Sequence, residues 1–201
     1  MPLSAARRPR RLVILAASLA LISVIGAHLA VTLRYKLDAG FFFGSPDAYA
    51  RVDADNVTEH RHLARPGATI DYAFGIANPG PFTVRLQEVI DEGSGSYTHE
   101  RVRMKELSRE KSPSPVDLGP ADAVPFRPVD LRPNAGLLVF VTLRLGQEIP
   151  PECAGFSFDV QRVRFTVLGM PREQLVPIGH VIKVEAPASD GEPCKDPGLG
   201  G

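Results

Sequence analysis

The sequence predicts an all-β fold, an immunoglobulin-like β-sandwich of about seven strands preceded by one N-terminal transmembrane helix. Two observations carry this prediction: an apolar run covers residues 12–33, and after residue 48 apolar residues recur with a period of two. A third is the spacing of Pro, Gly and Asn, which divide the chain into short segments. A length of 201 residues, of which 44% are hydrophobic and 23% charged, allows one compact domain plus an anchor.

The apolar run has the length of a membrane span. Residues 12–33 contain no Asp, Glu, Lys or Arg, and as a helix they reach about 33 Å, enough for a hydrocarbon core of about 30 Å. His28 lies near the outer end of the run, where a neutral imidazole suits the membrane interface. Four arginines precede the run, so residues 1–11 are expected to stay cytoplasmic and the rest to be extracytoplasmic. The predicted location is the cell membrane, with the bilayer as partner through residues 12–33.

A cleaved signal peptide is the alternative interpretation of this run. Its apolar core is usually about 7–15 residues long and ends in a small-x-small site. The present run is longer, and residues 26–30 (GAHLA) offer no clean site of that kind. The sequence therefore favours a retained signal anchor, and cleavage in the cell stays open.

The exported part divides into a juxtamembrane connector at residues 34–48, a β domain at residues 49–186 and a flexible tail at residues 187–201 that carries Cys194. The clearest alternation is that of Ile70, Tyr72, Phe74 and Ile76, which places these side chains on one face of a strand. The expected strands lie near residues 51–62, 69–76, 82–87, 101–105, 137–145, 156–167 and 175–184.

Some strands carry a further expectation about their place in a sheet. Arg101, Arg103 and Lys105 on one strand indicate an exposed or edge position. Residues 137–145 are apolar on both faces, which predicts a central strand. A change of phase within residues 156–167 predicts a β-bulge near residues 161–162. Five prolines in residues 108–128 predict a loop, not a sheet strand, anchored to the core by Phe126, Val129 and Leu131.

Three segments carry a resemblance to a known group of proteins: RPGATIDYAFGIANPGPFTV, PFRPVDLRPNAG, and RVRFTVLGMPREQLVPIGHVIKVEAP followed by a final Cys. Together they resemble membrane-anchored exported proteins of unknown function from high-GC Gram-positive (actinobacterial) bacteria, in which an immunoglobulin-like domain follows an N-terminal helix. The resemblance covers roughly residues 49–194. Its motifs are turn and core residues, so it implies a fold and a location but no catalytic residue.

Cys153 and Cys194 are the two cysteines of the chain. Both lie in the part expected outside the cell, where an even number of cysteines favours a disulfide. The bridge would tie the exit of residues 137–145 to the tail. A metal-binding or reactive pair is the alternative, but the sequence has neither C-x-x-C spacing nor a basic neighbourhood to support it.

His60 and His62 are the candidate metal ligands. Two residues apart on a strand, they project to the same face, and Glu59 or His99 could complete a site. The competing interpretation, which we favour, is that they are solvated loop histidines. His180 lies in phase with an apolar face and is expected to be a core residue rather than a catalytic base.

The remaining motifs indicate no chemistry. Residues 94 and 96 are serines without the strand-turn-helix context of a nucleophile, and Asn56 begins a three-residue glycosylation acceptor that arises often by chance. Beyond residue 33 the chain holds 19 basic and 23 acidic residues, a composition that argues against nucleic-acid binding. We expect no enzyme and no cofactor.

The leading functional hypothesis is a membrane-anchored extracytoplasmic module that contacts envelope components or a protein partner. One alternative is a metal-handling or assembly factor that uses His60, His62 and Met104. The other is an accessory subunit of a membrane complex, recognised through its helix.

Overall fold

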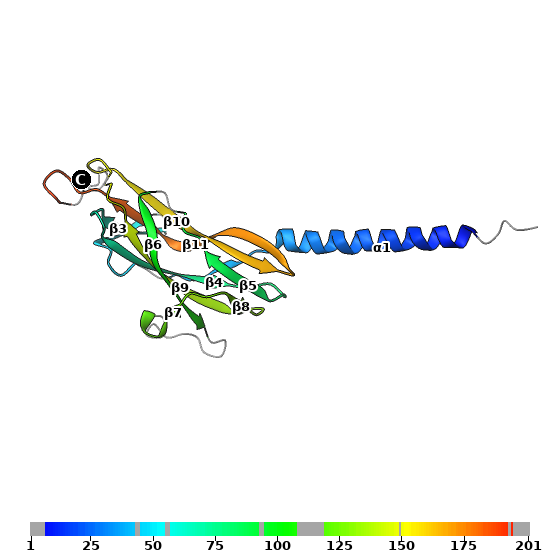
Figure 1. The fold of residues 1–201 in the computed structure, drawn as a ribbon. Helices are drawn as coiled ribbons and strands as arrows, with labels where there is room; N and C mark the ends of the chain where they lie inside the picture. Colours follow the sequence, from blue (N-terminus) through cyan, green and yellow to red (C-terminus); the bar gives the residue numbers. More distant parts are fainter. Residues whose placement is uncertain are drawn as a thin grey trace, which may run out of the picture. The chain divides into compact units, whose positions relative to one another are not determined.

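A computed structural model describes residues 7–42, 45–54, 57–92, 95–107, 119–148, 150–192 and 194. The chain separates into two compact units, Met1–Tyr35 and Lys36–Gly201 (Figure 1). Asn56 and the serine at 94 lie outside the described residues, as does most of the Pro-rich stretch, residues 108–118.

The first unit holds one helix, α1 (Arg7–Arg34). Its stretch Val13–Arg34 is long and apolar enough to cross a membrane, within one residue of the predicted span. Polar side chains in this stretch bond within the helix: Ser23 Oγ donates to Leu19 O and Thr32 Oγ1 to His28 O, both at 2.9 Å. Such bonds suit a lipid surround, which offers no hydrogen-bond partner. A signal sequence near the N-terminus can meet the same criteria of helix length and hydropathy.

The second unit is a β-sandwich. Its described strands are β1 (Asp38–Phe42), β2 (Ala50–Ala54), β3 (Val57–Leu63), β4 (Thr69–Ala77), β5 (Val84–Val89), β6 (Tyr97–Leu107), β7 (Val124–Pro125), β8 (Val129–Leu131), β9 (Gly136–Leu145), β10 (Gly155–Val167) and β11 (Met170–Glu185). One sheet has the order β1-β4-β9-β6-β7 and the other β2-β3-β11-β10-β5-β8.

Seven longer strands build the immunoglobulin-like arrangement. The central order β4-β9-β6 in one sheet matches strands B-E-D of that fold, and β5-β10-β11 in the other matches C-F-G. The seventh, β3, runs parallel to the last strand, β11. The predicted fold class, an all-β sandwich after one apolar helix, is confirmed.

The core lies where the period of two predicted it. Ile70, Tyr72, Phe74 and Ile76 are each at most 2% exposed. Strand β9 is paired on both sides, by β4 and β6, and it is buried on both faces. On its second face Leu138 and Phe140 pack with Ala73, so the predicted central position is confirmed.

Short edge strands are where the sequence-based expectations were wrong. The single strand expected at residues 51–62 is two antiparallel strands, β2 and β3, with Ala54 opposite Val57. The two residues between them in the sequence, Asp-Asn, are of types common in turns. Strand β6, expected to be exposed or at an edge, has exposed side chains such as Arg101 but is second from the edge, because β7 pairs with it at two positions.

The Pro-rich stretch was expected to be a loop, but part of it has regular secondary structure. Pro120–Asp122 forms a 3-10 turn, and Pro125 lies in β7 opposite Arg103. Because β7 is an edge strand, the N–H that proline lacks has no sheet partner to lose. Leu131, only 2% exposed, anchors the end of the stretch in the core as predicted.

The bulge predicted in β10 near residues 161–162 is not found there, and the nearest irregularity has its extra residues on β11 instead. The pairing of β10 with β11 shifts between Phe158 and Val160, where the longer segment belongs to β11 and includes Gly179 at φ +83°. The phase change near Gln161 has a different cause. Gln161 is a buried polar residue, and two hydrogen bonds offset the cost of its burial: it accepts one from Tyr72 Oη at 2.6 Å and donates one to Ile90 O at 2.7 Å.

The sandwich has two ends, which we define by their loops. At the entry end β1 begins opposite Ala77, the last residue of β4. The tips of this end are residues 78–83, 132–135 and 168–172. They are joined by backbone bonds from Asn78 N to Ala135 O and from Asn134 N to Asn78 O, and by the pairing of Val84 with Val167.

The opposite end, the far end, is formed by residues 64–68, 91–96, 146–154 and 186–194, of which 93, 94, 149 and 193 are outside the described residues. Backbone bonds join its loops: Leu145 N to Ala68 O, Gly146 N to Ser96 O and Ala186 N to Ala154 O. In Figure 1 the yellow loop before β10 and the red C-terminal segment lie at this end.

Candidate functional site

The two candidate metal ligands, His60 and His62, are buried on β3. Their side chains are 3% and 5% exposed. The interpretation as solvated loop histidines is therefore wrong. The physical reason is that residues from outside β3, Ser45 before β2 and His180 on β11, lie against these side chains.

Ser45, a residue that sequence reasoning did not single out, holds both histidines. Its backbone N–H donates to His60 Nδ1 at 2.7 Å, and its Oγ lies 2.9 Å from His62 Nε2. The same Oγ donates to Asp71 O at 2.5 Å. Since a hydroxyl has one proton, His62 Nε2 must carry the proton of the Ser45–His62 bond. The local sequence signal for Ser45 is the Gly-Ser-Pro composition of residues 44–46, which is typical of turns.

His180 joins this cluster from β11. Its ring centroid lies 4.6 Å from that of His60, and the residue is 4% exposed, which confirms the expected core position. Its Nε2 is buried and has no hydrogen-bond partner. Burial, and next the neighbouring His60, lowers the pKa of both His62 and His180 to about 4. Both rings are therefore neutral at pH 7.

This geometry does not suit nucleophilic catalysis. A catalytic serine must give its proton to the histidine, whereas Ser45 Oγ gives it to a backbone carbonyl and accepts one from His62. Ser45 is also fully buried, so no substrate reaches it. The cluster instead fastens the connector to both sheets, because His60 and His62 belong to one and Asp71 to the other.

The other proposed ligands are not part of the cluster. Glu59 accepts a hydrogen bond from Arg61, His99 lies on β6 in the opposite sheet, and Met104 is a core residue at 2% exposure. Across the described part of the chain, no three His, Cys, Asp or Glu side chains are placed to hold a metal ion.

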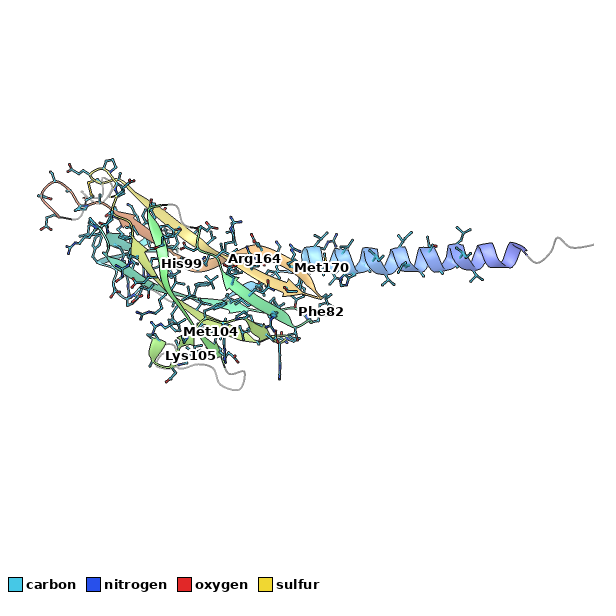
Figure 2. The ribbon with its side chains drawn as sticks, viewed as in Figure 1. Phe82, His99, Met104, Lys105, Arg164 and Met170 are labelled. Carbon is cyan, nitrogen blue, oxygen red and sulfur yellow. A yellow bond between two sulfur atoms is a disulfide. The ribbon has the colours of Figure 1, made fainter. Side chains whose placement is uncertain are left out.

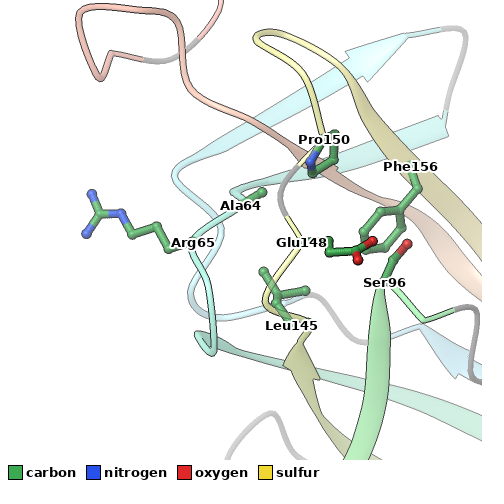
Figure 3. A pocket seen from close by; sticks show the side chains of 8 residues that line it. Ala64, Arg65, Ser96, Leu145, Glu148, Pro150 and Phe156 are labelled. Carbon is green, nitrogen blue, oxygen red and sulfur yellow. The ribbon is translucent and has the colours of Figure 1, made fainter.

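A shallow pocket at the far end is too small for a ligand. Figure 3 shows it between the loop after β9 and the start of β6, lined by Ser96, Leu145, Glu148 and Phe156 among others. Its interior of about 10 Å³ is room for about one water molecule.

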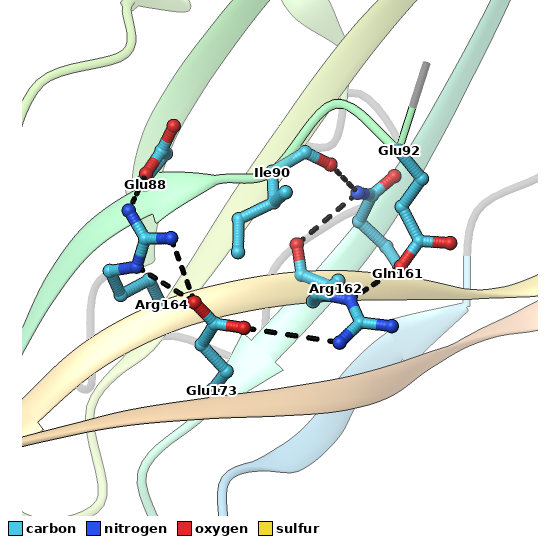
Figure 4. A network of polar contacts seen from close by, with 7 residues as sticks. All are labelled: Glu88, Ile90, Glu92, Gln161, Arg162, Arg164 and Glu173. Atoms are coloured by element: carbon cyan, nitrogen blue, oxygen red, sulfur yellow. Dashed lines mark hydrogen bonds and ion pairs between the residues drawn. The ribbon is translucent and has the colours of Figure 1, made fainter. Parts of the chain in front are cut away.

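A row of ion pairs crosses the outer face of β5, β10 and β11 (Figure 4). Arg164 donates to Glu88 at 2.5 Å and to Glu173 at 2.7 Å, and Arg162 donates to Glu92 at 2.6 Å. Hydrogen bonds donated to these glutamates raise the pKa of both guanidinium groups. Acids and bases alternate here, so this face presents no one-signed field for a charged ligand.

The two cysteines meet at the far end. Cys153 and Cys194 form a disulfide with their Cα atoms 5.7 Å apart, as the sequence predicted. Among the described residues no cysteine is free. The bridge ties the loop after β9 to the segment that follows β11.

No family model matches the chain, and no curated protein matches it in sequence. Solved structures resemble it weakly. The VesB protease of Vibrio cholerae shares 7% identity at a TM-score of 0.35, over 80% of this chain and 34% of that one. PapD-like domain 7 of human CEP192 shares 10% sequence identity at a TM-score of 0.31, over 65% of this chain and 82% of that one.

A family 123 glycoside hydrolase from Clostridium perfringens shares 13% identity at a TM-score of 0.35, over 76% of this chain and 28% of that one. The chain thus spans about a third of the protease's length. Likenesses at this level carry no argument about activity.

Proposed function

We propose that the protein is a non-enzymatic, single-pass membrane-anchored module that presents its β-sandwich outside the cytoplasm to an envelope component or a membrane protein partner. The observation that carries the proposal is the junction between the two units. An apolar helix of membrane-spanning length ends at Arg34, and after only three residues β1 of the sandwich begins.

The location of the sandwich rests on two further features. Arginines precede the apolar stretch, and basic flanks are retained on the cytoplasmic side. The Cys153–Cys194 bridge requires an oxidising compartment to form and persist. Both features favour an extracytoplasmic domain, and the resemblance to exported actinobacterial proteins agrees with them.

The state of the polar core supports a role in binding over one in catalysis. The Ser45–His62 pair is buried and internally bonded, and Gln161 is bonded to Tyr72 and Ile90. These groups stabilise the sandwich and are not accessible to a substrate. The surface of the sandwich is then the part that meets other molecules.

The test uses the full-length chain in cells, with an epitope tag at the C-terminus. Membranes washed with alkaline carbonate should retain the full-length protein, and protease added to intact cells should remove the tag. Chemical crosslinking in the same cells, followed by mass spectrometry, should give a defined protein or envelope adduct. A soluble product that begins after residue 33, or a tag protected from protease, would overturn the proposal.

A further inference from the structure

Strand β2 presents a free edge of the six-stranded sheet. It is the outermost strand of the order β2-β3-β11-β10-β5-β8, paired with β3 on one side and with no described strand on the other. Its five residues, Ala50–Ala54, have the sequence ARVDA and include no proline. Arg51 is exposed and Val52 is half-buried. The open backbone groups of such a strand can pair with a strand of another chain.

The other sheet edges are protected from such pairing. Prolines, which cannot donate to a sheet, interrupt them: Pro125 in β7, Pro128 and Pro133 on either side of β8, and Pro171 and Pro177 in the half of β11 that β3 leaves unpaired. Figure 2 shows Lys105 of β6 next to the turn before β7, where its Nζ pairs with Asp122 Oδ2 at 3.5 Å. Strand β1 lies against β11, and its pairing with β4 is irregular. Among the described edge strands, β2 is thus the one that neither proline nor a neighbouring element protects.

The hydrogen bonds of β3 show which of its residues bond to β2. Arg61 O accepts a hydrogen bond from Tyr49 N at 2.9 Å, on the β2 side of the strand. Ala64, which directly follows β3, donates its N–H to Glu185 O at 2.8 Å, on the β11 side. Because successive residues of a strand direct their backbone groups to opposite sides, the odd-numbered residues of β3 bond to β2 and the even-numbered ones to β11.

This alternation fixes the backbone groups that β2 offers at its free edge. Ala50 and Val52 lie opposite odd-numbered residues of β3, so their N–H and C=O groups point towards β3. Arg51 and Asp53 lie opposite even-numbered residues, and their N–H and C=O groups therefore point away from the domain. The two residues with open backbone groups thus belong to opposite charge types.

We propose that β2 is a self-association edge, at which two copies of this chain pair antiparallel about a two-fold axis through Val52. In this register Arg51 of each copy lies opposite Asp53 of the other, so both open residues bond across the interface and opposite charges face each other. A shift of two residues in either direction would set two arginines or two aspartates opposite each other, which is destabilising. The edge is therefore complementary to itself, and the partner that it fits is a second copy.

The resulting dimer is two-fold symmetric and joins two six-stranded sheets into one continuous sheet. Pairing of five residues a side buries little surface, so we expect a transient dimer rather than an obligate one. This inference goes beyond the proposed function and does not depend on the membrane anchor.

A cysteine on the proposed axis tests the contact. The native disulfide uses both cysteines of the chain, so Val52→Cys adds the only free thiol. Facing residues at such a position have Cα atoms about 4.5 Å apart, within reach of a disulfide. Full-length Val52→Cys in detergent, oxidised with copper phenanthroline, should give a dimer linked through residue 52, identified by non-reducing electrophoresis and mass spectrometry. Val124→Cys, at a 47% exposed valine on the edge strand β7, is the matched control and should give at least about fivefold less dimer, because its thiols meet only by collision.

Charge variants in the Val52→Cys background test the register. Arg51→Asp or Asp53→Arg alone should reduce the crosslinked dimer severalfold, because each sets like charges opposite each other. The double variant Arg51→Asp/Asp53→Arg should restore the dimer, and Arg65→Asp, at an exposed position outside β2, should leave it unchanged. Equal crosslinking of Val52→Cys and Val124→Cys, or a double variant that stays as low as the single ones, overturns the self-association edge.

Hydrogen exchange tests the same contact without any substitution. In the unmodified full-length protein, the amides of Arg51 and Asp53 should exchange more slowly at high protein concentration than at low concentration, because the second copy then occupies their hydrogen bonds. Exchange at these two amides that does not depend on concentration overturns the proposal.

Discussion

The Gln174 side chain holds Leu37 by both of its backbone groups: Leu37 N–H donates to Gln174 Oε1 at 2.9 Å, and Gln174 Nε2 donates to Leu37 O at 2.6 Å. The side-chain amide thus satisfies both backbone hydrogen-bonding groups of Leu37, as the backbone of a neighbouring strand does elsewhere in a sheet. Leu37 is 2% exposed, so water has little access to replace either bond.

Replacing Gln174 should therefore loosen the point at which the chain enters the domain. In Gln174→Leu the buried N–H and C=O of Leu37 lose their partners, at a cost of about 1–3 kcal/mol in the free energy of unfolding. Denaturant unfolding of full-length protein measures this, and hydrogen exchange should show faster exchange at the Leu37 amide. Gln147→Leu, the same change at an exposed far-end residue, should alter neither quantity.

The strands that the sequence predicted well are those with one strongly apolar face. Strand β4 is an example: the face that carries Tyr72 and Phe74 is buried, so apolar residues must recur at every second position. The short strands β2, β7 and β8 carry no such pattern. Each of them forms by pairing with a longer strand. Pro125 in β7 shows that even a residue disfavoured inside sheets can occupy an edge strand.

The histidine cluster was predictable in part. The spacing of His60 and His62 placed both on one face, and the apolar phase of His180 placed it in the core. The sequence could not predict which residues bury His60 and His62. Their burial comes from β11 and from Ser45, and a polar run such as Glu59–His62 gives no local sign that strands distant in sequence will enclose it.

Acid should destabilise the domain through these histidines. The folded-state pKa of His62 and of His180 is about 4, against an ordinary 6.5. Between these values the unfolded chain binds more protons than the folded one, so the free energy of unfolding decreases as pH falls from 6.5 towards 4. The slope is up to about 1.4 kcal/mol per pH unit for each histidine. Burial lowers the pKa of His99 as well, with the same sign.

Denaturant midpoints of the full-length protein between pH 7 and about pH 4 measure this slope. The variant His180→Leu should reduce it by up to one histidine's share, because one proton-binding group is removed. An unchanged slope would contradict the assignment of acid sensitivity to His180. A domain whose stability does not vary at all across this window would contradict the lowered pKa of both residues.

The disulfide should contribute most of its effect through the unfolded state. Cys153 and Cys194 are separated by 41 positions, and a closed loop of this size stabilises by about 4 kcal/mol in the chain-entropy model. Reduction with dithiothreitol should therefore lower the urea midpoint clearly. The double variant Cys153→Ser/Cys194→Ser should start at the lower midpoint and show no response to the reductant, which separates loss of the bridge from other effects of thiol.

Gly155 should be intolerant of any side chain although it lies at the exposed start of β10. A Cβ there would approach the Val184 carbonyl oxygen closer than real Cβ contacts allow, and Glu185 Cα is close as well. These are backbone atoms of the paired strand β11, which cannot rotate away. Gly155→Ala should therefore cost about 3 kcal/mol in the free energy of unfolding, at the upper end of the range for overpacking.

Gly169→Ala is the matched comparison. Gly169 has a φ of +80° but open space where a Cβ would stand, so its substitution meets conformational strain alone, about 1 kcal/mol. Denaturant unfolding of both variants separates the two causes. If Gly155→Ala proved no more destabilising than Gly169→Ala, the close approach of β10 and β11 at this position would be wrong, and with it the tight pairing that brings Cys153 toward the segment carrying Cys194.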